Sequence, residues 1–199
     1  MSVKNTAERW GAVSQAFHWT IVLLILMLAI VGLTMGELPR TPKYFWVYTA
    51  HKSLGITVLA LMLLRLAWRL YAGAPAPVPG TPRWQARIAS LTHGALYALA
   101  LAMPLSGWLY DSASGLRPFR LFGLVRMPKL VAPDDGVRDL AHGAHVWLFW
   151  VLVALVALHA GAAFYHHLFQ RDATLTRMLP RRRMASHASP SQESMHDAA

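Results

Sequence analysis

Five histidines lie in one apolar stretch, residues 140–170, which contains no Asp, Glu, Lys or Arg. They are His142, His145, His159, His166 and His167. Polar side chains inside such a segment are energetically costly and usually functional, and neutral imidazole is a good ligand for iron. His145 and His159 are fourteen positions apart, which puts them about 21 Å apart along a helix and within about 40° of one face. That face therefore offers two metal ligands, one toward each side of a membrane.

The elements that would position these ligands are long apolar helices. Residues 140–170 would form a helix about 46 Å long, which exceeds a hydrocarbon core of about 30 Å. Three earlier apolar runs, at residues 17–35, 47–70 and 88–110, are also long enough to cross a membrane. The sequence therefore predicts an all-α fold, an integral membrane four-helix up-and-down bundle. We expect one transmembrane di-haem domain over residues 1–180 and a basic, then polar, disordered cytoplasmic tail over residues 181–199.

Two more histidines lie at matching depths in this bundle. His18 is near the start of the first run and His51 near the start of the second. If neighbouring helices are antiparallel, His18 lies level with His159, and His51 lies level with His145. Two axial imidazoles saturate a haem iron, which favours electron transfer over oxygen binding. The four residues are thus predicted to ligate the irons of two haems in these two pairs.

Glycines, arginines and further histidines lie near the four predicted ligands in the sequence. Gly55 and Gly161 would let a flat macrocycle approach the helices, although glycines are also ordinary at membrane helix contacts. Arg65 and Arg69 near the end of the second run are expected to extend toward the membrane interface. Histidines near helix ends are most often interfacial. We therefore assign no ligand role to the remaining ones: His93, His142, His166 and His167.

Composition excludes several classes of function. The chain has 199 residues, of which 55% are hydrophobic and 14% charged, and its net charge is +10. These basic residues lie in short loops and the tail rather than on a soluble face, so no nucleic-acid partner is expected. Because there is no cysteine, thiolate-bound iron–sulfur clusters, C-x-x-C-H haem attachment and disulfides are excluded.

Loop charge predicts the orientation in the membrane. The side with both termini and the proline-rich loop at residues 72–82 carries eleven Lys and Arg residues, and the other side carries eight. The positive-inside rule then places both termini in the cytoplasm of a multi-pass protein in the bacterial inner membrane.

Several short motifs around these histidines resemble the bacterial cytochrome b561 family of four-helix di-haem membrane proteins. The motifs are Ala16-Phe17-His18-Trp19, Ala50-His51-Lys52-Ser53-Leu54-Gly55, Pro104-Leu105-Ser106-Gly107-Trp108, Ala144-His145-Val146-Trp147, and Leu158-His159-Ala160 followed by Tyr165-His166-His167. The resemblance covers roughly residues 8–180. It implies that His18, His51, His145 and His159 ligate two b-type haems, in agreement with the pairing above. It also implies a quinone as the lipid-soluble partner and, in one branch of the family, superoxide as the electron donor.

The favoured function is that of a membrane oxidoreductase that moves single electrons between a quinone and a small-molecule or protein donor. A positive outer surface formed by Lys52, Arg117, Arg120, Arg126 and Lys129 would steer a small anion such as superoxide. Ordinary solvated loop charges explain these residues equally well. One alternative is an electron-conduit cytochrome b subunit of a hydrogenase- or formate-dehydrogenase-like complex. The other is a histidine-rich metal-binding membrane protein, which would need acidic groups or broken helices along a path.

Overall fold

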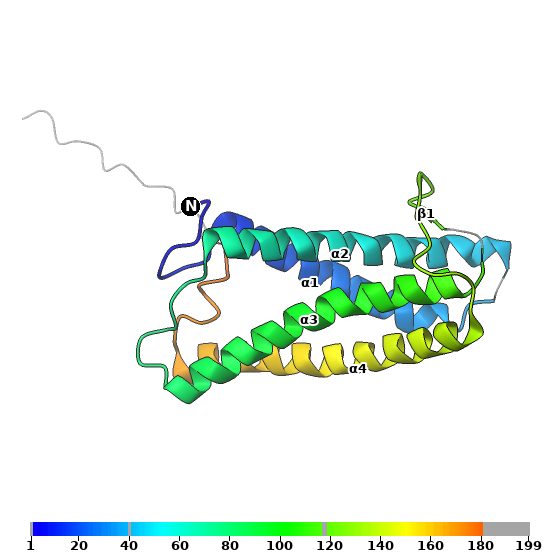
Figure 1. Ribbon diagram of the computed structural model, residues 1–199. Helices are drawn as coiled ribbons and strands as arrows, with labels where there is room; N and C mark the ends of the chain where they lie inside the picture. The colour runs from blue at the N-terminus through cyan, green and yellow to red at the C-terminus, as the bar shows by residue number, and fades with distance from the viewer. Residues whose placement is uncertain (1, 40, 117–118, 181–199) are drawn as a thin grey trace, which may run out of the picture.

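The computed structural model describes residues 2–39, 41–116 and 119–180, and the predicted tail at residues 181–199 lies outside them. Four long helices run along one another: α1 (Ala12–Met35), α2 (Phe45–Ala72), α3 (Arg83–Ala113) and α4 (Asp135–Tyr165). Figure 1 shows them as an up-and-down bundle, in which α3 packs against α4 and α2 contacts both α1 and α3. All four are long and apolar enough to cross a membrane. The predicted four-helix membrane bundle is therefore confirmed.

The first three helices are longer than their apolar runs, and α4 together with the helical turn that follows it is longer than the fourth run. The sequence predicted a third span at residues 88–110, whereas α3 begins at Arg83 and ends at Ala113. Charged residues mark where the hydrocarbon core ends, but a helix continues into the interface until a cap or breaker stops it. At the start of α4, the Asp134 side chain accepts a hydrogen bond from the Val137 amide (2.8 Å) and so caps the helix. At its end, α4 continues as one π-helical turn, η2 (His166–Gln170).

Few side chains are fully buried. A small cluster of Ile21, Val58, Met62 and Ala100 packs where α1, α2 and α3 meet. Large apolar side chains such as Leu23, Leu63 and Leu158 are exposed along the helices. Such an outward apolar surface is expected for helices in contact with lipid.

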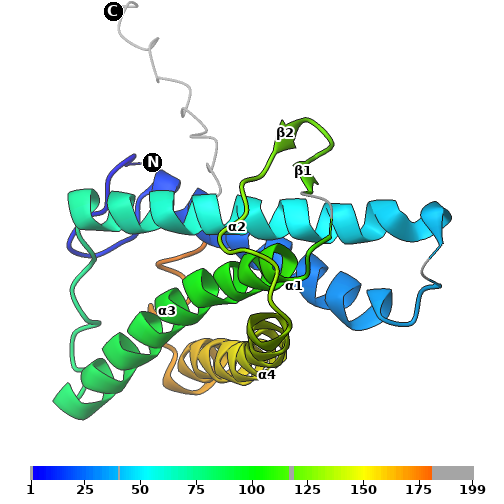
Figure 2. The ribbon, with the colours of Figure 1, turned by 45° about the vertical axis from the view of Figure 1, so that its right-hand side comes forward.

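The two ends of the bundle differ. At one end, segments far apart in sequence are linked by hydrogen bonds: Asn5 Nδ2 donates to the Gly73 carbonyl (2.8 Å), and Arg177 Nη1 donates to the Ala76 carbonyl (2.7 Å). At the other end, a short 3-10 turn, η1 (Pro42–Tyr44), joins α1 to α2. There the α3–α4 connection forms a small antiparallel hairpin, β1 (Arg120–Leu121) and β2 (Val125–Arg126). Figure 2 shows this hairpin standing out sideways from α2. We call these the N-terminal end and the hairpin end.

Candidate functional site

The bundle brings the four predicted ligands together as two pairs. Pair I, His18 of α1 and His159 of α4, lies toward the N-terminal end, and its ring centroids are 6.4 Å apart. Pair II, His51 of α2 and His145 of α4, lies toward the hairpin end, with ring centroids 6.5 Å apart. In both pairs the two rings are nearly perpendicular, at 76° and 78°. The α4 helix thus contributes one histidine to each pair, as its fourteen-residue spacing requires.

His145 is held by the region of α3 around Pro104. Its Nδ1 lies 3.1 Å from the Met103 carbonyl oxygen and 3.0 Å from Ser106 Oγ. A carbonyl oxygen can only accept a hydrogen bond, so this contact assigns the proton to Nδ1. The Nε2 atom of His145 is then unprotonated, which is the form that binds a metal.

Two glycines provide the space in which the pair II rings lie. A Cβ atom at Gly107 would be 3.0 Å from His145 Cε1, and one at Gly32 would be 3.3 Å from His51 Cε1. By contrast, a Cβ atom at Gly55 or Gly161 would meet no other part of the described chain within 4 Å. Gly55 and Gly161, which were named from the sequence, therefore border open space. The histidine rings of pair II lie against Gly32 and Gly107 instead. The sequence alone does not distinguish a glycine that borders open space from one that lies against a histidine ring.

Pair I has a cation beside it. Arg65 of α2 does not extend toward the interface as predicted, because its guanidinium group faces the bundle interior. Its Nη1 lies 3.1 Å from His18 Nδ1, and its Nε donates a hydrogen bond to Tyr97 Oη (3.1 Å). Arg69, one turn later, has its guanidinium over the rings of Trp10 and Tyr97. An arginine inside an apolar run was the sequence signal for this inward contact, since such residues usually face the bundle interior.

The remaining histidines occupy different surroundings. The His93 ring lies 5.4 Å from that of His159, so it is a close neighbour of pair I. The His142 ring contacts Tyr110 (5.0 Å), and His167 is exposed. In the described ranges no group of three or more His, Cys, Asp or Glu side chains could hold a metal ion. Nothing in these ranges therefore favours the metal-binding alternative.

His166 interacts with a carboxylate near the end of the described chain. Its Nδ1 lies 2.5 Å from Asp172 Oδ2, and the Thr174 amide donates to Asp172 Oδ1 (2.8 Å). Burial raises the pKa of the Asp172 carboxyl group. The hydrogen bonds from Thr174 and His166 together lower it by more, so this pKa lies below its ordinary value.

The predicted anion-steering residues differ in whether they have a carboxylate partner. Lys52 is paired with the buried Asp111 (Nζ to Oδ1, 2.5 Å), which compensates its charge. Arg120 and Arg126 are exposed on the hairpin, and the exposed Lys129 follows them. Arg117 lies outside the described residues. Of the described residues in this set, Lys52 is therefore the one whose charge is compensated by a carboxylate.

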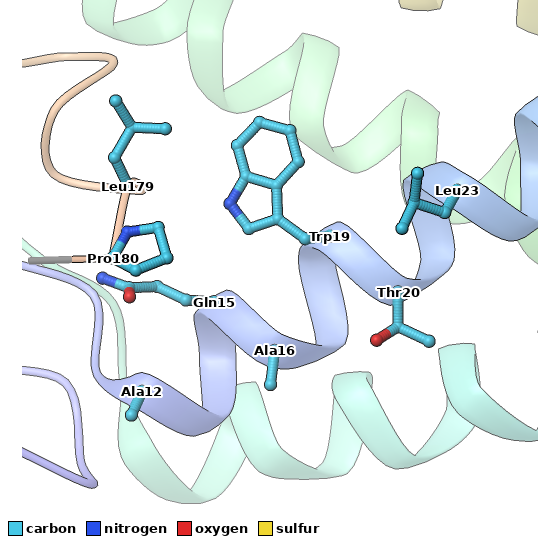
Figure 3. Close-up of a pocket in the computed structure, with 8 residues that line it drawn as sticks. All are labelled: Ala12, Gln15, Ala16, Trp19, Thr20, Leu23, Leu179 and Pro180. Carbon is cyan, nitrogen blue, oxygen red and sulfur yellow. The ribbon is translucent and has the colours of Figure 1, made fainter. Parts of the chain in front are cut away.

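An apolar pocket of about 590 Å³ lies along α1, and the ring of its lining residue Trp19 is 5.1 Å from the ring of His18. Figure 3 shows its lining residues: Ala12, Gln15, Ala16, Trp19, Thr20, Leu23, Leu179 and Pro180. Trp19 follows His18 directly, and its Nε1 donates to the Met178 carbonyl (3.0 Å), which holds the C-terminal segment against α1. The volume is within the range of small-molecule sites.

Comparison with known proteins agrees with this architecture. Cytochrome b561 homolog 2 of Escherichia coli K12 is 35% identical over 184 residues, covering 90% of this chain and 95% of the relative. Cytochrome b561 homolog 1 of the same organism is 34% identical over 177 residues, covering 88% and 99%. A protein of Yersinia pestis named probable superoxide oxidase CybB is 29% identical over 178 residues, covering 88% and 98%.

The family match spans nearly all of the helical region. Residues 9–181 match the family described as prokaryotic cytochrome b561. This family implies b-type haem, and the four apolar helices agree with a multi-pass bacterial membrane protein. The chain therefore belongs to the prokaryotic cytochrome b561 family of membrane cytochromes.

Proposed function

We propose that the protein binds two b-type haems, one through His18 and His159 and the other through His51 and His145. The observation that carries this proposal is the spacing within the pairs. A transition metal binds imidazole nitrogen at about 2.0 Å and the ring centroid lies about 1.1 Å further, so two opposed ligands have centroids about 6.2 Å apart. The separations of 6.4 and 6.5 Å fit this value. The 5.4 Å between His93 and His159 is too short for opposed ligands.

The polar atoms around the pairs also fit the group. His145 has its proton on the nitrogen that faces Met103, which leaves Nε2 for a metal. His51 Nδ1 is buried and has no hydrogen-bond partner in the described chain. A metal on the opposite ring nitrogen would fix the proton on Nδ1 and orient the ring.

Arg65 supplies the charge that a haem near pair I would need. Its guanidinium group is partly buried in the bundle and forms no ion pair with a carboxylate among the described residues. A haem carries two propionate carboxylates, and arginine binds carboxylates strongly because its donors form a planar fork. Arg65 would therefore hold a propionate in place of its contact with His18 Nδ1, which would free that nitrogen to carry a proton.

The bound haems would supply one-electron redox chemistry, and with two imidazoles on each iron they would leave no position for oxygen. The function that follows is a quinone-linked single-electron oxidoreductase of the bacterial inner membrane. The apolar pocket beside Trp19 supports a quinone partner because its lining is mostly apolar and the Trp19 ring lies 5.1 Å from the ring of His18. Superoxide is the proposed donor, supported by the name of the Yersinia pestis relative. Two superoxide anions would each lose one electron to give oxygen, and the quinone would take up two electrons and two protons.

The function is tested with the purified, haem-loaded protein in lipid nanodiscs containing ubiquinone. Enzymatically generated superoxide should reduce the haems and produce ubiquinol, with one quinol formed for every two superoxide anions consumed. Added superoxide dismutase should abolish both signals. Haems that are reduced by ubiquinol but not by superoxide would contradict the proposed donor and keep the quinone link. Haems that exchange electrons with neither compound would contradict the function.

A further inference from the structure

The hairpin that follows α3 is a fixed part of the bundle. The Phe122 amide donates to Ser53 Oγ (2.9 Å), and the Leu130 amide donates to Ser112 Oγ (3.1 Å). Ser53 and Ser112 are the largest fully buried side chains of the described residues. On the same side, Trp108 Nε1 donates to the Pro128 carbonyl (3.0 Å). The hairpin therefore has a defined position against α2 and α3.

Ser53 and Ser112 each follow a member of the Lys52–Asp111 ion pair, and such charges are expected near the membrane interface rather than at the centre of the bilayer. Ser53 lies eight residues into α2, about 12 Å from the start of the helix. Trp46 near this start is 69% exposed, as is typical of the aromatic belt at a membrane surface. Figures 1 and 2 both show the hairpin leaving α2 sideways rather than extending past its end. The hairpin thus lies along the membrane plane, below the outermost turn of α2.

The tip of the hairpin is apolar and uncovered. The exposed fractions are 54% for Phe122, 78% for Leu124 and 59% for Val125. A turn with positive φ at Phe122 (49°) and Gly123 (77°) presents these side chains together. In water such a cluster would be unfavourable, whereas apolar and aromatic side chains are stabilised at the headgroup and acyl-chain boundary.

Two arginines flank this tip. Arg120 and Arg126 face each other directly across the two strands, an arrangement that is destabilising for like charges. Both are exposed and neither forms an ion pair within the described chain, since the nearby Asp111 is paired with Lys52. Two adjacent guanidinium groups next to an apolar tip match the phosphate of a phospholipid headgroup above its acyl chains.

We propose that the hairpin at residues 119–127 is an interfacial membrane anchor that binds anionic phospholipid. Phe122, Leu124 and Val125 insert among the acyl chains, while Arg120 and Arg126 bind headgroup phosphate. The anionic headgroup neutralises the cross-strand repulsion between the two arginines, so the hairpin is most stable in a membrane that contains such lipids. This role is independent of the electron-transfer function.

Insertion of the tip is tested by thiol alkylation, which is specific here because the chain has no cysteine. The haem-loaded variants L124C and A132C are placed in nanodiscs containing phosphatidylglycerol. Ala132 is exposed in the same connection beyond the hairpin and serves as the matched control. A charged maleimide should react with L124C about tenfold more slowly than with A132C, because thiolate formation requires water. Equal rates for the two variants in nanodiscs would overturn the proposal.

The headgroup contact is tested by replacing both arginines. The double variant R120Q/R126Q should retain less phosphatidylglycerol than the unchanged protein in native mass spectrometry. R138Q is the matched control, because Arg138 is already paired with Asp135 (2.5 Å) and Asp139 (3.0 Å) and should not alter lipid retention. Equal retention by the double variant and the unchanged protein would overturn the proposal. A double variant that loses lipid while R138Q keeps it would support it.

Discussion

At the scale of single residues, the proposed haem ligands differ in how the chain prepares them. His145 has two polar neighbours on α3 that fix its ring, whereas His51 has none at its buried Nδ1. His18 faces a guanidinium group, which can only donate hydrogen bonds. The polar neighbours of the proposed ligands therefore differ from one histidine to the next. Substitutions at pair I and at pair II should have separate effects.

Replacing His145 by alanine should remove the pair II haem and leave the pair I haem. The haem content should fall by about half, because His51 would lose its opposed ligand and a single imidazole holds a b-type haem weakly. Haem per chain is measured by the pyridine method on the purified variant. H142A, one turn away on the same helix, and H93A are controls that should keep both haems. Unchanged haem content in H145A would contradict the pairing.

Arg65 should raise the midpoint potential of the pair I haem. A nearby positive charge favours the reduced iron, so R65Q should lower this potential by about 40 mV, which corresponds to about 1 kcal/mol for one electron. Redox titration in detergent resolves the two haems. R69Q should cause a smaller shift, because Arg69 lies over Trp10 and Tyr97 rather than against His18. An R65Q protein with both potentials unchanged would show that Arg65 acts on neither haem.

Among the elements, the segment that follows α4 is held by a pH-dependent contact between Asp172 and His166. The Asp172 carboxylate accepts hydrogen bonds from His166 and Thr174, and its pKa is lower in the folded protein than its ordinary value of 3.8. A lowered pKa stabilises the folded state above the unfolded-state value, and this contribution is lost as the pH falls through the folded-state pKa. The contact is therefore complete at neutral pH and is lost in acid below about pH 4.

Hydrogen exchange should reveal this loss in residues 171–180. At pH 7, D172N should lower the protection of these amides roughly tenfold, in line with about 1.5 kcal/mol for a hydrogen bond to a charged group. The unchanged protein should show a similar loss of protection factor only when the pH is lowered toward 3. D139N, which alters an exposed carboxylate at the hairpin end, should behave like the unchanged protein. Equal protection in D172N and the unchanged protein would mean that another contact holds this segment.

The sequence predicted the elements well and their connections poorly. Apolar runs located all four helices, because the membrane requires long uncharged segments whatever the rest of the chain does. The end of α3 was predicted too early, because the charged Asp111 ended the apolar run at residue 110. In the structure Asp111 is buried in the last turn of α3 and paired with Lys52. The hairpin was not predicted, since its two-residue strands depend on Ser53 and Ser112, far away in the sequence. Helical spacing could show which histidines share a face, but not that Gly32 and Gly107 make room for two of them.

At the scale of the whole molecule, the fold joins both ends of the described chain at one end of the bundle. Arg9 Nη2 donates to the Leu179 carbonyl, and the Ala76 amide donates to the Ala7 carbonyl (2.9 Å). These contacts tie the N-terminal segment, the proline-rich loop and the segment after α4 together. Whichever side of the membrane holds one of them must hold all three.

The loop charges predict that this end is cytoplasmic. In cells with a permeabilised outer membrane, a membrane-impermeant maleimide should label A132C at the hairpin end and should not label A74C in the proline-rich loop. Both positions are exposed, so the comparison reports sidedness rather than burial. Labelling of A74C alone would place the termini outside and contradict the orientation predicted from loop charge.

The central claim is that four histidines hold two haems in one chain. Its most direct test is the visible spectrum of the detergent-purified protein, oxidised and dithionite-reduced, with haem quantified per chain by the pyridine method. Two low-spin b-type haems per chain are expected, because each iron would have two imidazole ligands. A preparation made with adequate haem supply that contains one haem per chain, or a high-spin spectrum, would contradict it.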